Sequence, residues 1–188
     1  KMYNEALEIS NDQLRLSKKI FKEDDIEYLK PFINIGKTYY FLNDYFNSEE
    51  SFKNSLVILE KFHNNYNLQL IETLEYLCRI YKIKKMENEH LDVLLRIKDL
   101  ITQEENQYSN KKKIKIFENI CSIYEKQNNV DKIMETLNLL LKAKEEEYGE
   151  EDPSLIENLE NLILLNIKYD KNKTTEKLII QILKIIEK

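Results

Sequence analysis

Few residues of this 188-residue chain have the types and the spacing that chemistry at a site requires. A nucleophilic cysteine needs a base close to it, and neither Cys78 nor Cys121 has a histidine at a matching position. The two histidines, His63 and His90, belong to no cluster with the spacing of metal ligands. The only two glycines stand alone, so no phosphate-binding loop is present. We therefore expect no catalysis, no metal site and no cofactor.

Composition excludes most other classes of protein. Glycine and proline occur twice each, whereas all-β and α/β folds need many turn residues. The net charge of −5 is opposite to the basic excess typical of nucleic-acid binding. The longest uninterrupted apolar run, Leu162–Leu165, is far shorter than the roughly 20 residues of a membrane-spanning helix. We therefore expect an all-α protein with short connections that binds neither nucleic acid nor a membrane.

A repeat with a period near 42 residues organises the chain. In the segment Phe32–Tyr39, large, small and aromatic residues recur at i, i+3, i+4 and i+7, which is one stripe of a helix. Matching segments begin at Leu74, Phe117 and Leu159. A second stripe with helical spacing follows each of them at a constant offset. Each repeat is therefore predicted to be a pair of helices, A and then B.

Recurring N-cap residues mark where the A helices begin. The four positions carry Asp25, Asn67, Asn110 and Asp152, whose side chains can accept from the free N–H groups of a first helical turn. Pro31 conflicts with this pattern, because inside a helix it removes a hydrogen bond to the carbonyl of residue 27. The first A helix therefore either starts at residue 30 or is kinked there.

These markers predict one continuous repeat domain over residues 1–188, a piece of a longer protein. It opens with an unpaired B helix at about 3–21, and four helix pairs follow at about 26–63, 68–106, 111–148 and 153–187. Within the pairs, the A helices are expected at about 26–42, 68–84, 111–127 and 153–169. The B helices are expected at about 45–63, 87–106, 130–148 and 173–187.

The pattern resembles the tetratricopeptide repeat (TPR). The positions that carry this resemblance are Gly36, Tyr39, Tyr45, Ser48, Phe52 and Ser55. The family period is about 34 residues, and the longer period here, with the segment 148–153 leading into 159–162, looks like the kinesin-light-chain variety. The resemblance implies a right-handed α-solenoid of antiparallel helix pairs. It also implies a concave groove, lined by A helices, that binds extended peptides or partner helices.

One register position of the A helices is mostly asparagine. Asn34, Asn119 and Asn161 recur there, with Tyr76 in the remaining copy. An asparagine side chain both donates and accepts, so a row of them can bind a peptide backbone without reading its sequence, and the resemblance implies this role. Alternatively, asparagine is merely frequent in this chain and exposed at this position.

The charge of the predicted groove changes along the chain. Its N-terminal half is basic and aromatic, whereas its C-terminal half offers carboxylates, which favours an acidic ligand near the first two pairs. Those carboxylates belong to Glu118, Glu125, Glu157 and Glu160. The complete set of predicted groove residues is Lys30, Asn34, Lys37, Tyr40, Tyr76, Arg79, Lys82, Asn119, Ser122 and Asn161.

The function that the sequence favours is a non-catalytic, cytoplasmic scaffold that binds a protein or peptide partner. Two alternatives remain open. The last predicted helix is apolar on more than one face, so it could mediate self-association in a structural or assembly protein. The chain could also be the peptide-sensing domain of a larger regulator, whose effector domain would lie outside this sequence.

Overall fold

The computed structural model describes residues 2–21, 25–62, 67–103, 108–169 and 172–187. These residues form α-helices, two short 3₁₀ helices and turns, and none of them lies in a β-strand. The chain divides into two compact units, residues 1–93 and 94–188, and the boundary falls inside α5 (Glu87–Gln103). The predicted all-α class is confirmed.

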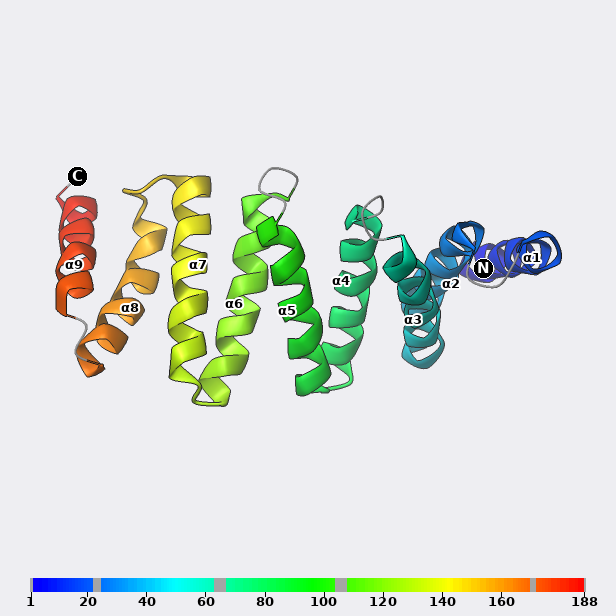
Figure 1. The fold of residues 1–188 in the computed structure, drawn as a ribbon, viewed down its shortest axis with the longest axis horizontal. Helices are drawn as coiled ribbons and strands as arrows, with labels where there is room; N and C mark the ends of the chain where they lie inside the picture. Colours follow the sequence, from blue (N-terminus) through cyan, green and yellow to red (C-terminus); the bar gives the residue numbers. More distant parts are fainter. Residues whose placement is uncertain (1, 22–24, 63–66, 104–107, 170–171, 188) are drawn as a thin grey trace. The chain divides into compact units, whose positions relative to one another are not determined.

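The first unit is a row of antiparallel helices that pack in chain order (Figure 1). Its complete helices are α1 (Met2–Ile20), α2 (Leu29–Phe41), α3 (Tyr45–Lys61) and α4 (Asn67–Ile83). The fully buried Phe52 of α3 packs with Leu77, Ile80 and Tyr81 of α4. The apolar stripes that defined the repeat thus face one another across neighbouring helices.

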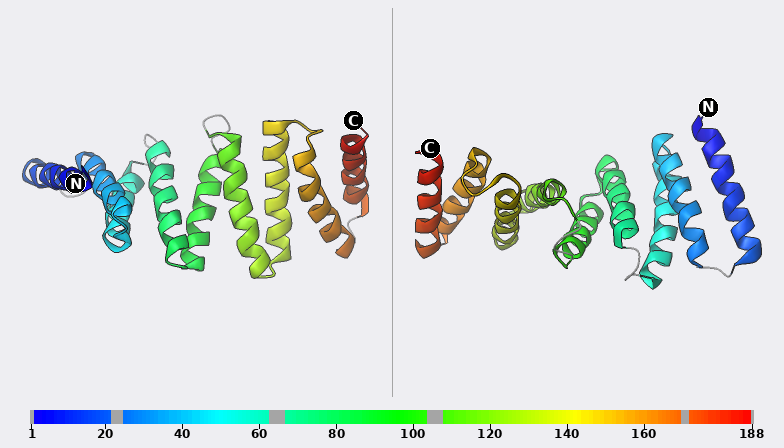
Figure 2. Two further views of the ribbon diagram at one scale, coloured as in Figure 1. Left: turned by 180° about the vertical axis from the view of Figure 1, so that it is seen from behind. Right: turned by 90° about the horizontal axis from the view of Figure 1, so that it is seen from above.

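The second unit repeats this arrangement, and Figure 2 shows the same order of helices from behind. After the C-terminal half of α5 come α6 (Asn110–Lys126), α7 (Val130–Tyr148), α8 (Ile156–Lys168) and α9 (Asn172–Ile186). Its core is built by side chains of α6, α7 and α8 that are at most a few per cent exposed. They include Ile120, Leu137, Leu140, Leu159 and Leu162.

Three turns between A and B helices share one backbone geometry. Asn43, Lys85 and Asn128 each have a positive φ between 53° and 59°, a conformation that ends helices and that asparagine tolerates well. In each turn the N–H of the following residue donates to the carbonyl five residues before it, with N···O distances of 2.9–3.0 Å. The B helix then starts at once, and Asp44 and Asn129 cap two of these helices with their side chains. The short turns keep each pair antiparallel.

The observed starts of the A helices refine the predicted ones. Asp25 and Asp152 are N-caps as expected, but each caps a 3₁₀ turn (η1, Ile26–Tyr28, and η3, Pro153–Leu155) that precedes its α-helix. Because α2 begins at Leu29, Pro31 lies in its first turn, where no intrahelical partner is lost. The prediction for Asn110 was wrong, because Ser109 is the N-cap and Asn110 is already helical. Asn67 is likewise the first residue of α4.

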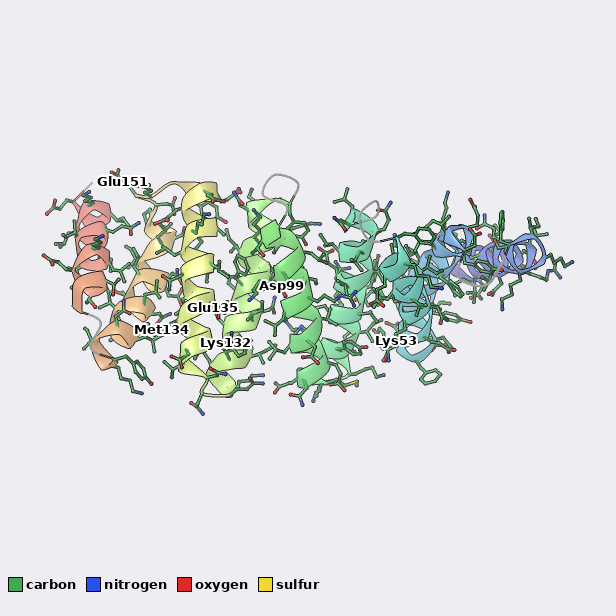
Figure 3. The ribbon with its side chains drawn as sticks, in the orientation of Figure 1. Lys53, Asp99, Lys132, Met134, Glu135 and Glu151 are labelled. Atoms are coloured by element: carbon green, nitrogen blue, oxygen red, sulfur yellow. The ribbon has the colours of Figure 1, made fainter. Side chains whose placement is uncertain are left out.

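An ion cluster ties α3 to the turn after α4. The buried Glu49 accepts from the Nζ atoms of Lys53 and Lys84, each at 2.6 Å, and Figure 3 shows Lys53 on α3. Burial alone would raise the pKa of Glu49, but the two lysines outweigh it, so this pKa is lowered from 4.5. Glu49 therefore stabilises the fold as a carboxylate.

A Glu49→Gln variant is expected to be less stable than the wild-type protein at neutral pH, with a difference that shrinks in acid. A lowered pKa stabilises the folded state above the unfolded-state value near 4.5, and this contribution disappears as the pH falls through the folded-state pKa. Urea unfolding of both proteins between neutral pH and pH 3 measures it. The neighbouring, exposed Glu50→Gln is the control and should show no such trend. A difference for Glu49→Gln that is constant with pH would contradict the assignment.

Candidate functional site

Two predicted groove residues of the first unit form an aromatic pair between α2 and α4. The rings of Tyr40 and Tyr76 meet edge to face, with centroids 5.3 Å apart. Tyr76 also stacks on the buried ring of Phe52, with centroids 4.9 Å apart. The position that carries asparagine in the other copies is therefore held here by aromatic packing on the core.

Two cations lie over the same ring. The guanidinium carbon of Arg79 is 5.0 Å from the Tyr76 centroid, and Nζ of Lys37 is 5.8 Å from it, within the range of a cation–π contact. Lys37 also pairs with Glu72 at 2.7 Å, and Arg79 with Glu75 at 3.6 Å. We call Lys37, Tyr40, Tyr76 and Arg79 the Tyr76 cluster. It offers aromatic surface beside two cations, each of which is paired with one carboxylate.

Other predicted residues of this unit take different places. Lys30 and Lys82 are exposed, and Asn34 is half-buried. They share helices α2 and α4 with the Tyr76 cluster, but the ring and cation contacts described above do not include them. The structure thus brings together four of the predicted groove residues of this unit.

The second unit has a cavity of about 230 Å³ among α6, α7 and α8. Two predicted residues, Ser122 and Asn161, line it. Asn119 does not, and its Nδ2 donates to the carbonyl of Lys115 on its own helix at 2.7 Å. The asparagines at this register position therefore have different surroundings. The amide nitrogen of Asn119 donates within its own helix, whereas Asn161 lines the cavity. The full lining is Glu118, Cys121, Ser122, Glu125, Leu137, Leu140, Lys144, Glu157, Asn158 and Asn161.

Sequence reasoning did not select Asn158 as a site residue. It lies one register position before the large residue of the repeat, where the other copies carry Pro31, Thr73 and Ile116. Its Nδ2 donates to the carbonyl of Leu137 on α7, so it joins neighbouring repeats. A polar residue at a buried interhelical position was the available signal, since burying such a group is costly unless it is bonded.

Both cysteines are free thiols with suppressed ionisation. Burial raises the pKa of Cys78 to about 11 and, with help from Glu125 and Glu118, raises that of Cys121 to about 12. A reactive cysteine needs the opposite shift. Both thiols therefore act as small hydrophobes in the packing of the helices.

Two further properties of the described residues bear on function. Within these ranges, no three His, Cys, Asp or Glu side chains gather as metal ligands do. No helix in the same part of the chain is both long enough and apolar enough to span a membrane.

On α9, the apolar side chains Ile179, Leu183 and Ile186 are all exposed.

Comparison with known proteins gives a likeness of fold only. No protein-family model matches the chain, and neither does any curated protein. Among solved structures, the TPR-like repeats of a putative kinesin light chain from Podosopora anserina superpose with a TM-score of 0.63 at 14% identity, over 97% of this chain and 86% of that one. The chain has a TPR-like repeat fold. This confirms the solenoid of helix pairs that the sequence predicts, in its kinesin-light-chain-like form.

Two further solved structures also superpose on the chain. BtubC (BKLC) from P. vanneervenii superposes with a TM-score of 0.53 at 12% identity, over 98% of this chain and 74% of that one. MamA from Desulfovibrio magneticus RS-1 gives 0.50 at 16% identity, over 98% and 86%. At such identities, the likeness shows the fold and says nothing of what this TPR-like chain binds. Its function has to be inferred from its own exposed side chains.

Proposed function

We propose that the chain is a non-catalytic protein-interaction scaffold that binds a peptide or a partner helix on its A helices. The observation that carries this is the Tyr76 cluster. Tyrosine and arginine are enriched among the residues that dominate binding energy at interfaces. Here they are pre-positioned, because Tyr76 is fixed by Phe52 below and Tyr40 beside it. The ligand that fits carries a carboxylate next to an apolar group.

The TPR-like fold supports the same proposal. Repeat proteins of this kind present extended surfaces on which binding residues recur along successive repeats. The location proposed for the scaffold is the cytoplasm. Self-association through α9 is a second candidate, favoured by its exposed Ile179, Leu183 and Ile186.

A peptide-display selection tests the scaffold proposal. The wild-type protein is expected to enrich one motif that contains an acidic residue or a free carboxylate. A Lys37→Met plus Arg79→Met variant keeps the apolar stems but loses both charges. Since a hydrogen bond to a charged group contributes about 1.5–3 kcal/mol, we expect the selected peptide to bind this variant at least about tenfold more weakly.

The matched control is Lys18→Met plus Lys19→Met, which makes the same change of net charge on the exposed side of α1. It should bind the selected peptide with wild-type affinity. The proposal fails if the wild-type protein enriches no motif. It also fails if the control weakens binding as much as the Lys37→Met plus Arg79→Met variant does.

A further inference from the structure

Lys37, one of the two cations of the Tyr76 cluster, is held closely by a carboxylate of the chain itself. Its Nζ lies 2.7 Å from a carboxylate oxygen of Glu72, which is hydrogen-bonding distance, and 5.8 Å from the ring centroid of Tyr76. Both contacts come from α4, so the ammonium group of α2 is held against that helix. A ligand carboxylate that approaches Lys37 therefore meets a position that Glu72 already occupies.

Arg79, the other cation, is held less closely. Its guanidinium nitrogen is 3.6 Å from the nearest carboxylate oxygen of Glu75, which is too long for a hydrogen bond. A guanidinium carries five N–H donors, and 51% of the Arg79 side chain is exposed. The two cations are therefore unequal, because a ligand can reach Arg79 directly but has to take Lys37 from Glu72.

The ion pair of Lys37 and Glu72 is not part of the repeat architecture. The corresponding positions of the second unit carry Ser122 and Glu157, which cannot form an ion pair. In the first repeat the register position of Glu72 carries Lys30. The TPR-like fold therefore forms with either charge at this position, and the repeat does not require the pair.

Glu72 can leave Lys37 at little cost. Its side chain is 44% exposed, and it lies one turn before Tyr76 on the same face of α4. A carboxylate that leaves this position stays in water, so no buried charge is left without a partner. Exposed ion pairs contribute little net stability. Replacing Glu72 by a ligand carboxylate at Lys37 is therefore close to balanced in free energy.

We propose that Glu72 is a built-in competitor for the carboxylate of the ligand, and that it thereby sets the affinity of the Tyr76 cluster. In the free protein it occupies Lys37, and the ligand carboxylate that contacts Arg79 displaces it. A carboxylate alone gains little, because one ion pair at Lys37 is broken for each one that forms. The ligand must therefore add contacts with the rings of Tyr40 and Tyr76. This inference rests on the proposed function and adds a residue that limits which acidic ligands bind.

A cycle of two peptides and two proteins tests the exchange. The display-selected peptide is made once with its carboxylate and once with the matching amide, and the protein is compared with its Glu72→Gln variant. The variant should bind the acidic peptide about three- to tenfold more tightly, because no internal pair has to be broken and no second carboxylate repels the ligand. It should bind the amide peptide with wild-type affinity, since an amide does not compete for Lys37. Isothermal titration calorimetry measures the four affinities.

Glu8→Gln is the matched control, because it makes the same change of net charge at an exposed position of α1. It should leave both affinities unchanged. Equal tightening by Glu8→Gln would show diffuse electrostatics and overturn the proposal. Weaker binding of both peptides by Glu72→Gln would also overturn it, because Glu72 would then position Lys37 for the ligand. Unchanged binding of the acidic peptide would exclude competition altogether.

Display selection on the wild-type protein and on Glu72→Gln distinguishes the failure of this inference from the failure of the scaffold proposal. If the wild-type motif depends on Lys37 and Arg79 but binds Glu72→Gln no more tightly, the competitor proposal is wrong and the scaffold proposal stands. If only the variant enriches an acidic motif, Glu72 competes as proposed, and the scaffold proposal for the wild-type protein fails. If neither protein enriches a motif, both proposals are wrong.

Discussion

A Phe52→Ala variant is expected to lose about 3–5 kcal/mol of unfolding free energy, the usual cost of removing a fully buried phenylalanine. Phe52 is 0% exposed and lies at the centre of the first unit. Its ring stacks on Tyr76 and fills the space that Gly36 leaves open, since a Cβ at Gly36 would lie 3.0–3.1 Å from three ring atoms. Neighbouring helices cannot close that volume without moving α2 against α3.

Urea unfolding followed by far-UV circular dichroism measures this loss. Phe46→Ala is the matched control, because it removes the same side chain from the same helix at a position that is 73% exposed. Its effect should stay within about 0.5 kcal/mol. Similar losses for the two variants would show that the Phe52 ring is not the packing centre of this unit.

The repeat could be predicted from the sequence because it depends on local rules that recur. A small residue at 36, an aromatic residue at 52 and a turn at 43 are each required for one helix to pack against the next. Because the pattern recurs along the chain, several copies support the same prediction. The 3₁₀ turns before α2 and α8 could not be read in this way. A cap such as Asp25 marks only where a helical turn begins, and both turn types accept it.

The candidate sites were less predictable, for a physical reason. The sequence places Asn34, Tyr76, Asn119 and Asn161 at one register position, but each side chain finds its own partners. Tyr76 packs on aromatic rings, whereas the amide nitrogen of Asn119 bonds within its own helix. Register fixes the helix face, whereas contacts between helices decide which side chains meet. This is also why the sequence alone did not show that Asn158 bonds to the neighbouring helix α7.

The two thiols are expected to be nearly inert in the folded protein and reactive once it unfolds. Only the thiolate is a nucleophile. With a pKa of about 11 for Cys78 and about 12 for Cys121, about one thiol in a thousand and about one in ten thousand are ionised at pH 8. An unfolded thiol, with a pKa near 8.5, is about one-quarter ionised. Alkylation by iodoacetamide should therefore be at least about 200-fold slower in buffer than in urea.

The dependence of this alkylation on pH distinguishes suppressed ionisation from steric blocking. A raised pKa means that the folded protein holds the proton, so the rate should keep rising about tenfold per pH unit through pH 10, where an ordinary thiol has levelled off. For Cys121, Glu118→Gln plus Glu125→Gln should raise the rate at fixed pH, because those carboxylates help to raise its pKa. For Cys78 the same variant should change nothing, since neither carboxylate contributes to its pKa. A plateau near pH 9, or equal effects at the two cysteines, would show that access of the reagent limits the reaction and that the carboxylates of the cavity do not act on Cys121.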